Sequence, residues 1–262
     1  MFRKELRCKR PMVVVLFLLL LVVFSPCAGC GKKGALIPPD GYLPPPVSSL
    51  QVVQQGERFR ISWMASEQDF PGAGSSPLAG FRLYRREIRS PADECLTCGV
   101  EDLLLRSVEL EYLQDVVRDG NLFAVVDGTV QLGKSYQYQV TAFEKGGVEN
   151  RDSGRVKRKK VQPPPAPIVG IGAVPAGLLL EWPAVEVTAG TLTGYNIYRS
   201  RLADHWDFRP LTSAPVRENR YEDLRMKPEI LYRYQVRSVA NLGGETVESD
   251  PSPQVEGSYL LP

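Results

Sequence analysis

Two cysteines in the middle of the chain have a spacing that could support chemistry. Cys95 and Cys98 enclose two residues, and this C-x-x-C spacing occurs in thiol–disulfide exchange, zinc and haem-attachment sites. Redox activity would need a surrounding βαβ unit, and zinc would need two more ligands, whereas the only histidine, His205, lies far along the chain. Gly99 rather than histidine follows Cys98, which argues against haem. We expect a structural disulfide between Cys95 and Cys98, no metal and no cofactor.

Other signs of catalysis are scarce. The chain has 262 residues, with Lys+Arg 32 against Asp+Glu 30, a balance that excludes a strongly basic nucleic-acid-binding protein. One histidine argues against a histidine-based triad, and neither the G-x-S-x-G nor the H-E-x-x-H motif is present. Hydrophobic residues make up 43% of the chain, which is enough to build buried cores. We therefore predict a protein that is not an enzyme and does not bind nucleic acid.

The N-terminus has the layout of an export signal. Five basic residues and one acidic residue precede an unbroken apolar run from Met12 to Phe24. This run is shorter than the ~20 residues that span a bilayer, but it fits the apolar part of a signal peptide. The basic flank disfavours a buried core helix or an uncleaved anchor. We predict a signal peptide over residues 1–29. Because that segment holds five cations and one anion, its removal leaves 27 Lys+Arg against 29 Asp+Glu, a net charge of −2.

The residues after the apolar run resemble the lipobox of bacterial lipoproteins. Small residues, Ala28 and Gly29, precede Cys30, while Cys27 stands where that family has leucine. The resemblance implies cleavage before Cys30 and acylation of its thiol, so that palmitate-type chains anchor the protein in a lipid bilayer. Gly31 after the cysteine implies sorting to the outer membrane, facing the periplasm. The alternative is ordinary secretion with Cys30 as a free thiol.

Residues 30–45 form a predicted tether. Its start is similar to small proteobacterial lipoproteins associated with the lipopolysaccharide-assembly translocon, which implies a Gram-negative envelope. The residues that match are Cys30, Gly31, Lys33, Gly34, Leu36 and Pro39. The prolines that follow predict a stiff, extended spacer of ~3.1 Å per residue.

An internal repeat follows the tether. Trp63 lies 17 residues after Pro46, and Trp182 lies 17 residues after Pro165. Each copy then has a Gly-aromatic-x-aliphatic-Tyr-Arg segment, at 80–85 and 194–199, and a Tyr-x-Tyr-x-Val segment, at 136–140 and 232–236. Apolar and polar residues alternate in these segments, which predicts half-buried antiparallel strands. Two such sheets must cover each other's apolar faces, so each copy is predicted to be a β-sandwich.

These motifs resemble the fibronectin type III family. The core signature consists of Trp63 and Trp182 together with Tyr136 and Tyr232, which match the family's tyrosine-corner position. The resemblance implies an all-β fold of two tandem immunoglobulin-like sandwiches. We place the first domain at 46–162 and the second at 163–262.

Three surface features leave alternatives open. The first copy has an 18-residue insertion around Cys95 and Cys98, which is a binding loop or a tolerated insertion. The basic run 155–160 has two interpretations. It is a contact for an anionic lipid or a phosphorylated glycan, or it is a solvated edge strand, which is the interpretation we favour. The stretch from His205 to Phe208 also has two interpretations. Its exposed aromatic rings stack on a sugar or a protein, or they cover the end of a sandwich.

The function predicted from these features is a membrane-anchored, non-catalytic scaffold that binds an envelope protein. The alternatives are an accessory lipoprotein that binds peptidoglycan or lipopolysaccharide and a redox protein that uses Cys95 and Cys98.

Overall fold

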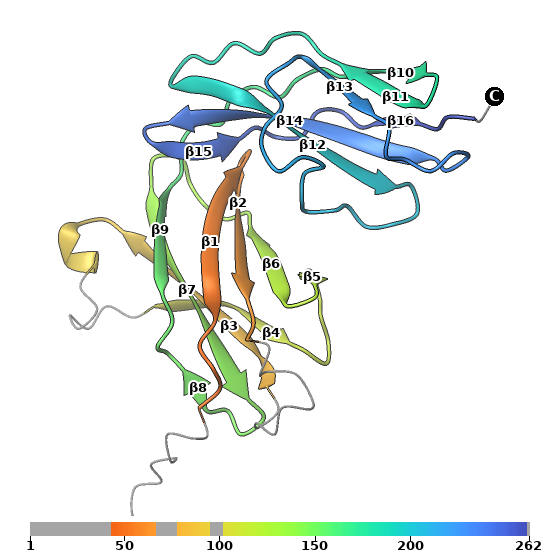
Figure 1. Cartoon of the computed structure of the whole chain (residues 1–262). Helices are drawn as coiled ribbons and strands as arrows, with labels where there is room; N and C mark the ends of the chain where they lie inside the picture. The colour runs from red at the N-terminus through yellow and green to blue at the C-terminus, as the bar shows by residue number, and fades with distance from the viewer. Residues whose placement is uncertain (1–42, 67–77, 95–101, 261–262) are drawn as a thin grey trace, which may run out of the picture. The chain divides into compact units, whose positions relative to one another are not determined.

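Strands build almost all of the regular structure. The computed structural model describes residues 43–66, 78–94 and 102–260, and Asp40–Pro262 belong to one compact unit (Figure 1). In these ranges the one departure from strands and loops is a short 3-10 turn, η4 (Pro91–Glu94). The fold is all-β, as the sequence predicts.

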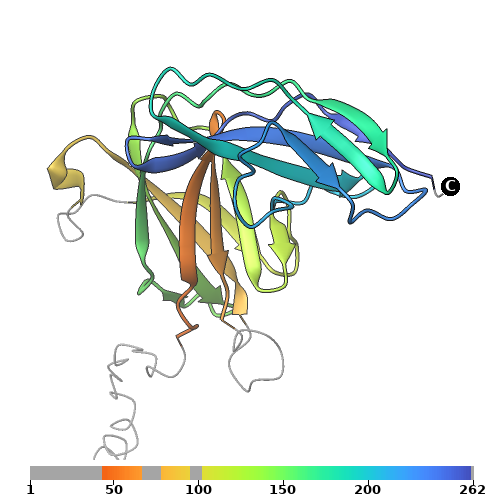
Figure 2. The same ribbon diagram turned by 45° about the horizontal axis from the view of Figure 1, so that its top comes forward.

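The first sandwich contains β1 to β9 in two layers (Figures 1 and 2). One sheet has the order β1-β2-β6-β5, and the other has the order β4-β3-β7, with β8 and β9 both paired to β7. The bounds are β1 (Ser48–Gln55), β2 (Arg58–Met64), β3 (Leu78–Ile88), β4 (Leu103–Glu109), β5 (Val117–Asp119), β6 (Leu122–Asp127), β7 (Ser135–Glu144), β8 (Glu149–Asn150) and β9 (Arg155–Lys159).

The second sandwich contains β10 to β16. One sheet has the order β10-β11-β13, and the other contains β12 and β14, with β15 and β16 both paired to β14. The bounds are β10 (Gly170–Val174), β11 (Gly177–Glu181), β12 (Thr191–Arg201), β13 (Arg220–Asp223), β14 (Tyr232–Leu242), β15 (Glu245–Glu248) and β16 (Val255–Gly257). Each copy is therefore a β-sandwich of two sheets, as the sequence predicts.

Each sandwich has its own hydrophobic core. On β2, alternate side chains are fully buried, and the last of them, Trp63, stacks on Phe123 with ring centroids 5.9 Å apart. In the second core, Trp182 packs edge-on against Tyr195 at 5.1 Å. Because strands place alternate side chains on opposite faces, these residues form the inner faces of the sheets.

A polar cluster recurs in both cores. In the first, the buried carboxylate of Asp127 accepts hydrogen bonds from Tyr138 Oη and Arg85 Nη1, both at 2.7 Å. In the second, Asp223 accepts from Tyr234 Oη at 2.9 Å and Arg199 Nη1 at 2.7 Å. The repeat therefore extends from the apolar pattern to the ion pairs that close each core.

The two tyrosine corners are also present. Tyr136 Oη accepts a hydrogen bond from the backbone N–H of Gln131 at 3.1 Å, and Tyr232 Oη accepts one from Lys227 at 3.3 Å. The arginines of the polar clusters lie over the two tyrosine rings, about 5 Å from the ring centroids. The corner thus ties the turn before β7 or β14 to the strand that follows.

The copies differ between their third strand and their tyrosine corner. The first copy forms β4, β5 and η4 there in addition to β6. In the second copy, residues 202–219 run beside β12 with backbone hydrogen bonds between Tyr195 and Val216 and from Leu211 to Ile197, but they form no strand. The insertion predicted in the first copy therefore contributes strands to the sandwich as well as a loop.

Candidate functional site

The two sandwiches are joined by a β-ladder. Strand β1 pairs in parallel with β15, with Gln54 opposite Val247 and Gln55 opposite Glu248. The backbone N–H of Gly56 extends this ladder by donating to Glu248 O at 2.9 Å. A Cβ at Gly56, where φ is +57°, would lie 1.9 Å from Asp250 Oδ1, so glycine is required at this contact.

A buried carboxylate organises the joint. Glu248, 4% exposed, accepts hydrogen bonds from Gln55 Nε2 and Asn196 Nδ2 at 2.8 Å and from Tyr198 Oη at 3.0 Å. Burial and the neighbouring Glu248 carboxylate raise the pKa of Tyr198 well above its usual value. The Nε of Arg237 lies 3.8 Å from the same carboxylate. Side chains from both sandwiches therefore share one acceptor.

The connection between the domains is bonded to β1. The side-chain amide of Gln54 donates to Val161 O at 2.7 Å and accepts from Val161 N at 3.0 Å. The fully buried Lys160 pairs with Glu57 at 2.8 Å. A lysine ammonium is stable in a buried position only when it is paired and hydrogen-bonded. The ion pair with Glu57 therefore fixes Lys160, and the two hydrogen bonds from Gln54 fix Val161.

The basic run 155–160 is only partly a solvated edge, which corrects the reading we favoured. Arg158 Nε lies 3.0 Å from Glu245 Oε2 of the second sandwich, and Arg158 also donates to the backbone oxygen of Thr246. Lys160 is buried at the joint, as described above. The local pattern of charges could not show this, because Glu57 and Glu245 lie far from the run in sequence.

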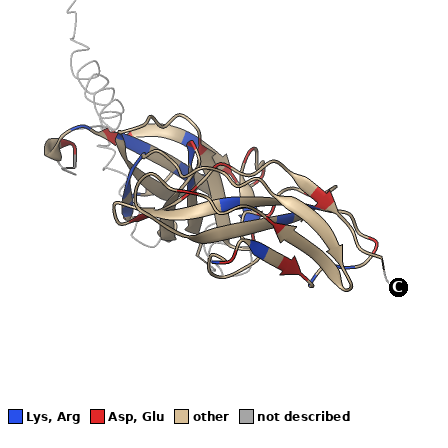
Figure 3. Ribbon diagram, turned by 90° about the horizontal axis from the view of Figure 1, so that it is seen from above, with Lys and Arg blue, Asp and Glu red and all other residues tan. Residues whose placement is uncertain are grey.

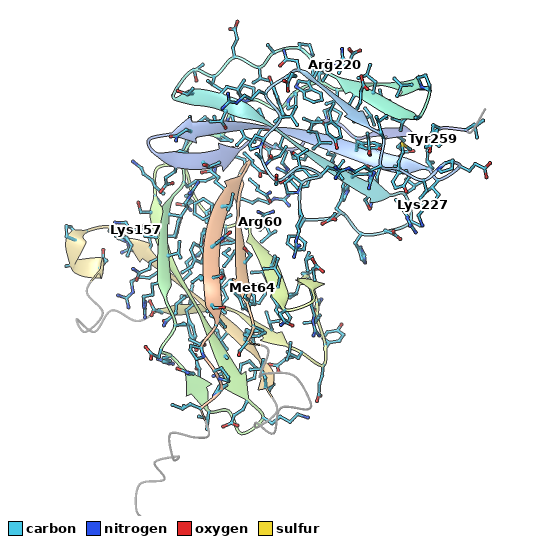
Figure 4. The ribbon with its side chains drawn as sticks, viewed as in Figure 1. Arg60, Met64, Lys157, Arg220, Lys227 and Tyr259 are labelled. Atoms are coloured by element: carbon cyan, nitrogen blue, oxygen red, sulfur yellow. The ribbon has the colours of Figure 1, made fainter. Side chains whose placement is uncertain are left out.

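The loop with Trp206 and Phe208 reaches the first sandwich. Arg60 on β2, labelled in Figure 4, donates from Nη1 to Phe208 O at 2.7 Å. Arg209 pairs with Asp119 at 2.7 Å. The guanidinium of Arg233 lies over the ring of Trp206, with its Cζ 4.6 Å from the ring centroid. These aromatics therefore lie beside the other domain rather than closing the end of their own.

A groove lies at this contact, and we call it the joint groove. It has a volume of about 230 Å³. Its wall from the first sandwich consists of Gln55, Arg60, Val117, Ala124 and Val126. Its wall from the second consists of Tyr198, Trp206, Asp207, Phe208, Gln235 and Arg237. Three aromatic rings, two arginines and two glutamine amides suit a ligand with an apolar or ring-shaped body and hydrogen-bonding substituents.

The ionisable side chains that line the joint groove are those of Arg60, Arg237, Asp207 and Tyr198. Its lining contains no cysteine, serine or histidine. Across residues 43–66, 78–94 and 102–260, no three His, Cys, Asp or Glu side chains gather closely enough to hold a metal. None of the helical segments described there is long and apolar enough to cross a membrane.

The residues singled out from sequence fall into two groups. Cys30, Cys95 and Cys98 lie outside the described residues. Trp63 and Tyr136 are buried in the first core, and Trp182 and Tyr232 are buried in the second. The indole N–H groups of Trp63 and Trp182 are both buried without a hydrogen-bond partner, so these rings contribute packing rather than polar contacts.

One stretch of the sequence matches the motif of a phosphate-binding loop. Residues 128–135 read Gly-Thr-Val-Gln-Leu-Gly-Lys-Ser, which fits G-x-x-x-x-G-K-S. Such a loop binds phosphate when it leads from a strand into a helix N-terminus. Here it is the turn from β6 to β7 and contains the tyrosine corner. The match is therefore a turn sequence without the context that phosphate binding requires.

Comparisons with known proteins add little to the geometry. No family model matches the chain, and no curated protein matches it. Among solved structures it is similar to a crystal structure of the FN1–FN3 domains of chicken CNTN1, with 14% sequence identity, 83% of this chain and 69% of that chain covered, and a TM-score of 0.34. The description of the fold rests on the strand order and the two tyrosine corners.

Proposed function

We propose that this chain is a lipid-anchored protein of the bacterial cell envelope whose two sandwiches form a non-catalytic interaction module. Residues 1–29 are the signal peptide, acylated Cys30 is the anchor, and the segment up to residue 45 is the tether. The sandwiches face the periplasm from the outer membrane.

The β1–β15 ladder is the observation that carries the proposal. It fixes Gln55 opposite Glu248 and is reinforced by the buried Glu248 and by the clamp of Gln54 on Val161. A pair of domains held in this way presents its surfaces in one arrangement, so a partner does not have to order them on binding. This suits a scaffold better than two modules on a flexible linker would.

The joint groove is the surface we assign to the partner. Val126, 49% exposed, and Val117 form its apolar side, and Arg60 and Arg237 supply hydrogen-bond donors. Apolar centres with aromatic and arginine neighbours are typical of protein interaction sites.

Glycan binding is the second candidate. The rings of Trp206 and Phe208 beside the amides of Gln55 and Gln235 offer the stacking surface and planar hydrogen-bonding groups that sugars use. Peptidoglycan and lipopolysaccharide are the envelope glycans that such a site would bind.

Photo-crosslinking in living cells tests both. Benzoylphenylalanine is placed at Val126 in the joint groove or, as a control, at Leu132, which is 60% exposed in the same sandwich but outside the groove. The proposal predicts a discrete protein adduct at position 126 and none at 132. An adduct that glycan-degrading enzymes remove would support the second candidate. The same adducts at both positions, or none at either, would contradict the role assigned to the groove.

A further inference from the structure

Basic residues occupy paired positions of neighbouring strands on the outer face of the β3–β7–β9 sheet. Residues opposite each other in neighbouring strands point to the same face, so each set of partners forms a row. One row contains Arg86, Gln137 and Lys157, and the next contains Leu104, Tyr84, Gln139 and Arg155. Arg82 lies opposite Thr141 in a third row. Basic residues therefore lie on the strands at both sides of the central strand β7. Figure 3 marks the Lys and Arg positions along the ribbon in blue.

Two carboxylates on this face are each shared between two arginines. Glu149 lies 2.9 Å from Arg82 and 3.8 Å from Arg151. Asp102 lies 2.8 Å from both Arg86 and Arg155. Each group of three keeps one net positive charge.

Long exposed cations surround these groups. The side chain of Arg151 is 73% exposed and lies over the ring of Tyr84 at 5.6 Å. Lys157 and Lys159 are exposed on β9, and Lys157 is labelled in Figure 4. Among the described residues of this face, basic side chains therefore outnumber the carboxylates of Glu149 and Asp102, although the chain without residues 1–29 has a net charge of −2.

An exposed leucine lies among the cations. Leu104, in the row of Tyr84 and Arg155, is 47% exposed. A surface that combines basic groups with exposed apolar side chains suits the boundary of an anionic bilayer, where the cations meet the headgroups and the apolar groups enter the interface. A soluble polyanion would gain nothing from the exposed Leu104.

We propose that this surface, formed by Leu104, Arg82, Arg151, Lys157 and Lys159 and here called the basic sheet face, docks on the anionic headgroups of a lipid bilayer. The inference goes beyond the proposed function, because it assigns a second membrane contact made by the folded domain itself. If Cys30 is acylated, the tether keeps the basic sheet face close to the bilayer, and docking becomes an intramolecular step with a high effective concentration.

The test uses residues 30–262 with Cys30→Ala, so that neither an acyl anchor nor the cations and apolar run of residues 1–29 can contribute. Co-sedimentation is measured with vesicles of phosphatidylcholine alone and with vesicles that also contain phosphatidylglycerol. We expect binding to the mixed vesicles alone, and its loss in roughly 1 M salt, where the screening length falls to about 3 Å. Because each Lys near an anionic surface contributes roughly fivefold to binding, Lys157→Gln with Lys159→Gln should weaken binding about 30-fold.

Matched variants separate the basic sheet face from general charge. Arg225→Gln with Lys227→Gln removes the same charge from exposed positions of the second sandwich and should change binding less than twofold. Leu104→Ser should weaken binding to vesicles, whereas competition by a soluble phosphorylated oligosaccharide should be weak. Equal effects of the two double variants, binding to neutral vesicles, or full competition by the oligosaccharide would overturn the proposal. Since acylation is absent throughout, these outcomes do not depend on the anchor proposed for Cys30.

Discussion

Gln55 and Glu248 face each other across a parallel β-ladder that runs from one sandwich into the other, and their side chains are joined by a hydrogen bond of 2.8 Å. The carboxylate of Glu248 also accepts from Asn196 and Tyr198 of its own sandwich. The joint is thus built like the interior of a sheet, with paired backbone and satisfied buried polar groups.

Removal of the Glu248 charge should loosen the joint. Glu248→Gln replaces an acceptor that serves three donors with an amide that cannot accept from all of them, so we expect a loss of about 1–3 kcal/mol in the free energy of unfolding. Denaturant titration measures the loss, and distances between spin labels on the two sandwiches measure the loosening. Glu256→Gln, at an exposed position of the second sandwich, is the control. Unchanged distance distributions in Glu248→Gln would mean that this carboxylate does not hold the joint.

Gly56 offers a second test of the joint. Gly56→Ala combines a left-handed backbone with a Cβ placed 1.9 Å from Asp250 Oδ1, whereas Gly120→Ala has nearly the same φ, +58°, and no atom within 4 Å. Both variants should lose about 1 kcal/mol to backbone strain, and only Gly56→Ala should lose more. Thermal unfolding compares the two. Equal losses would show that the approach to Asp250 is relaxed in solution.

The core tryptophans should act locally. Trp63→Ala removes a fully buried ring that stacks on Phe123, and Trp182→Ala removes one that packs on Tyr195. Each should cost about 3–5 kcal/mol, because a large cavity cannot be refilled. Hydrogen exchange should show lost protection in the strands of the mutated sandwich, with the other sandwich protected longer. Loss of protection in both at the same rate would show that the two cores unfold as one unit.

Asp127 should make the free energy of unfolding depend on pH in the acidic range. Burial alone would raise its pKa, but hydrogen bonds from Tyr138, Thr129 and Arg85 outweigh burial and hold the pKa below its usual value. A carboxyl whose pKa is lower in the folded state stabilises the fold above its unfolded pKa, about 3.9, and this contribution disappears as the pH falls through the folded pKa. The free energy of unfolding should therefore decrease below about pH 4. Asp127→Asn should be less stable at pH 7 and show a shallower decrease in acid. A decrease as steep as that of the unmodified chain would assign the acid sensitivity to other carboxyls.

The sequence could predict the fold because the patterns that identify each strand lie within a few consecutive residues. The alternation of Phe59, Ile61 and Trp63 with polar neighbours identifies a half-buried strand, and the same pattern around Tyr234 identifies another. Two copies of the pattern then indicate two sandwiches.

The joint could not be predicted in the same way. Gln54 and Gln55 look like ordinary polar strand residues, and Lys160 looks like part of a solvated basic run. Their burial depends on Val161, Glu248 and Glu57, which are distant in sequence or lie in the other domain. No periodicity within a single strand encodes such a contact.

Mass spectrometry of the N-terminal peptide from the membrane fraction tests the central claim, that the module is held in the envelope by Cys30. The account predicts a chain that begins at Cys30 and carries a diacylglyceryl group on its thiol. A free Cys30 thiol, a chain that retains residues 1–29, or recovery of the protein in the soluble fraction would contradict it.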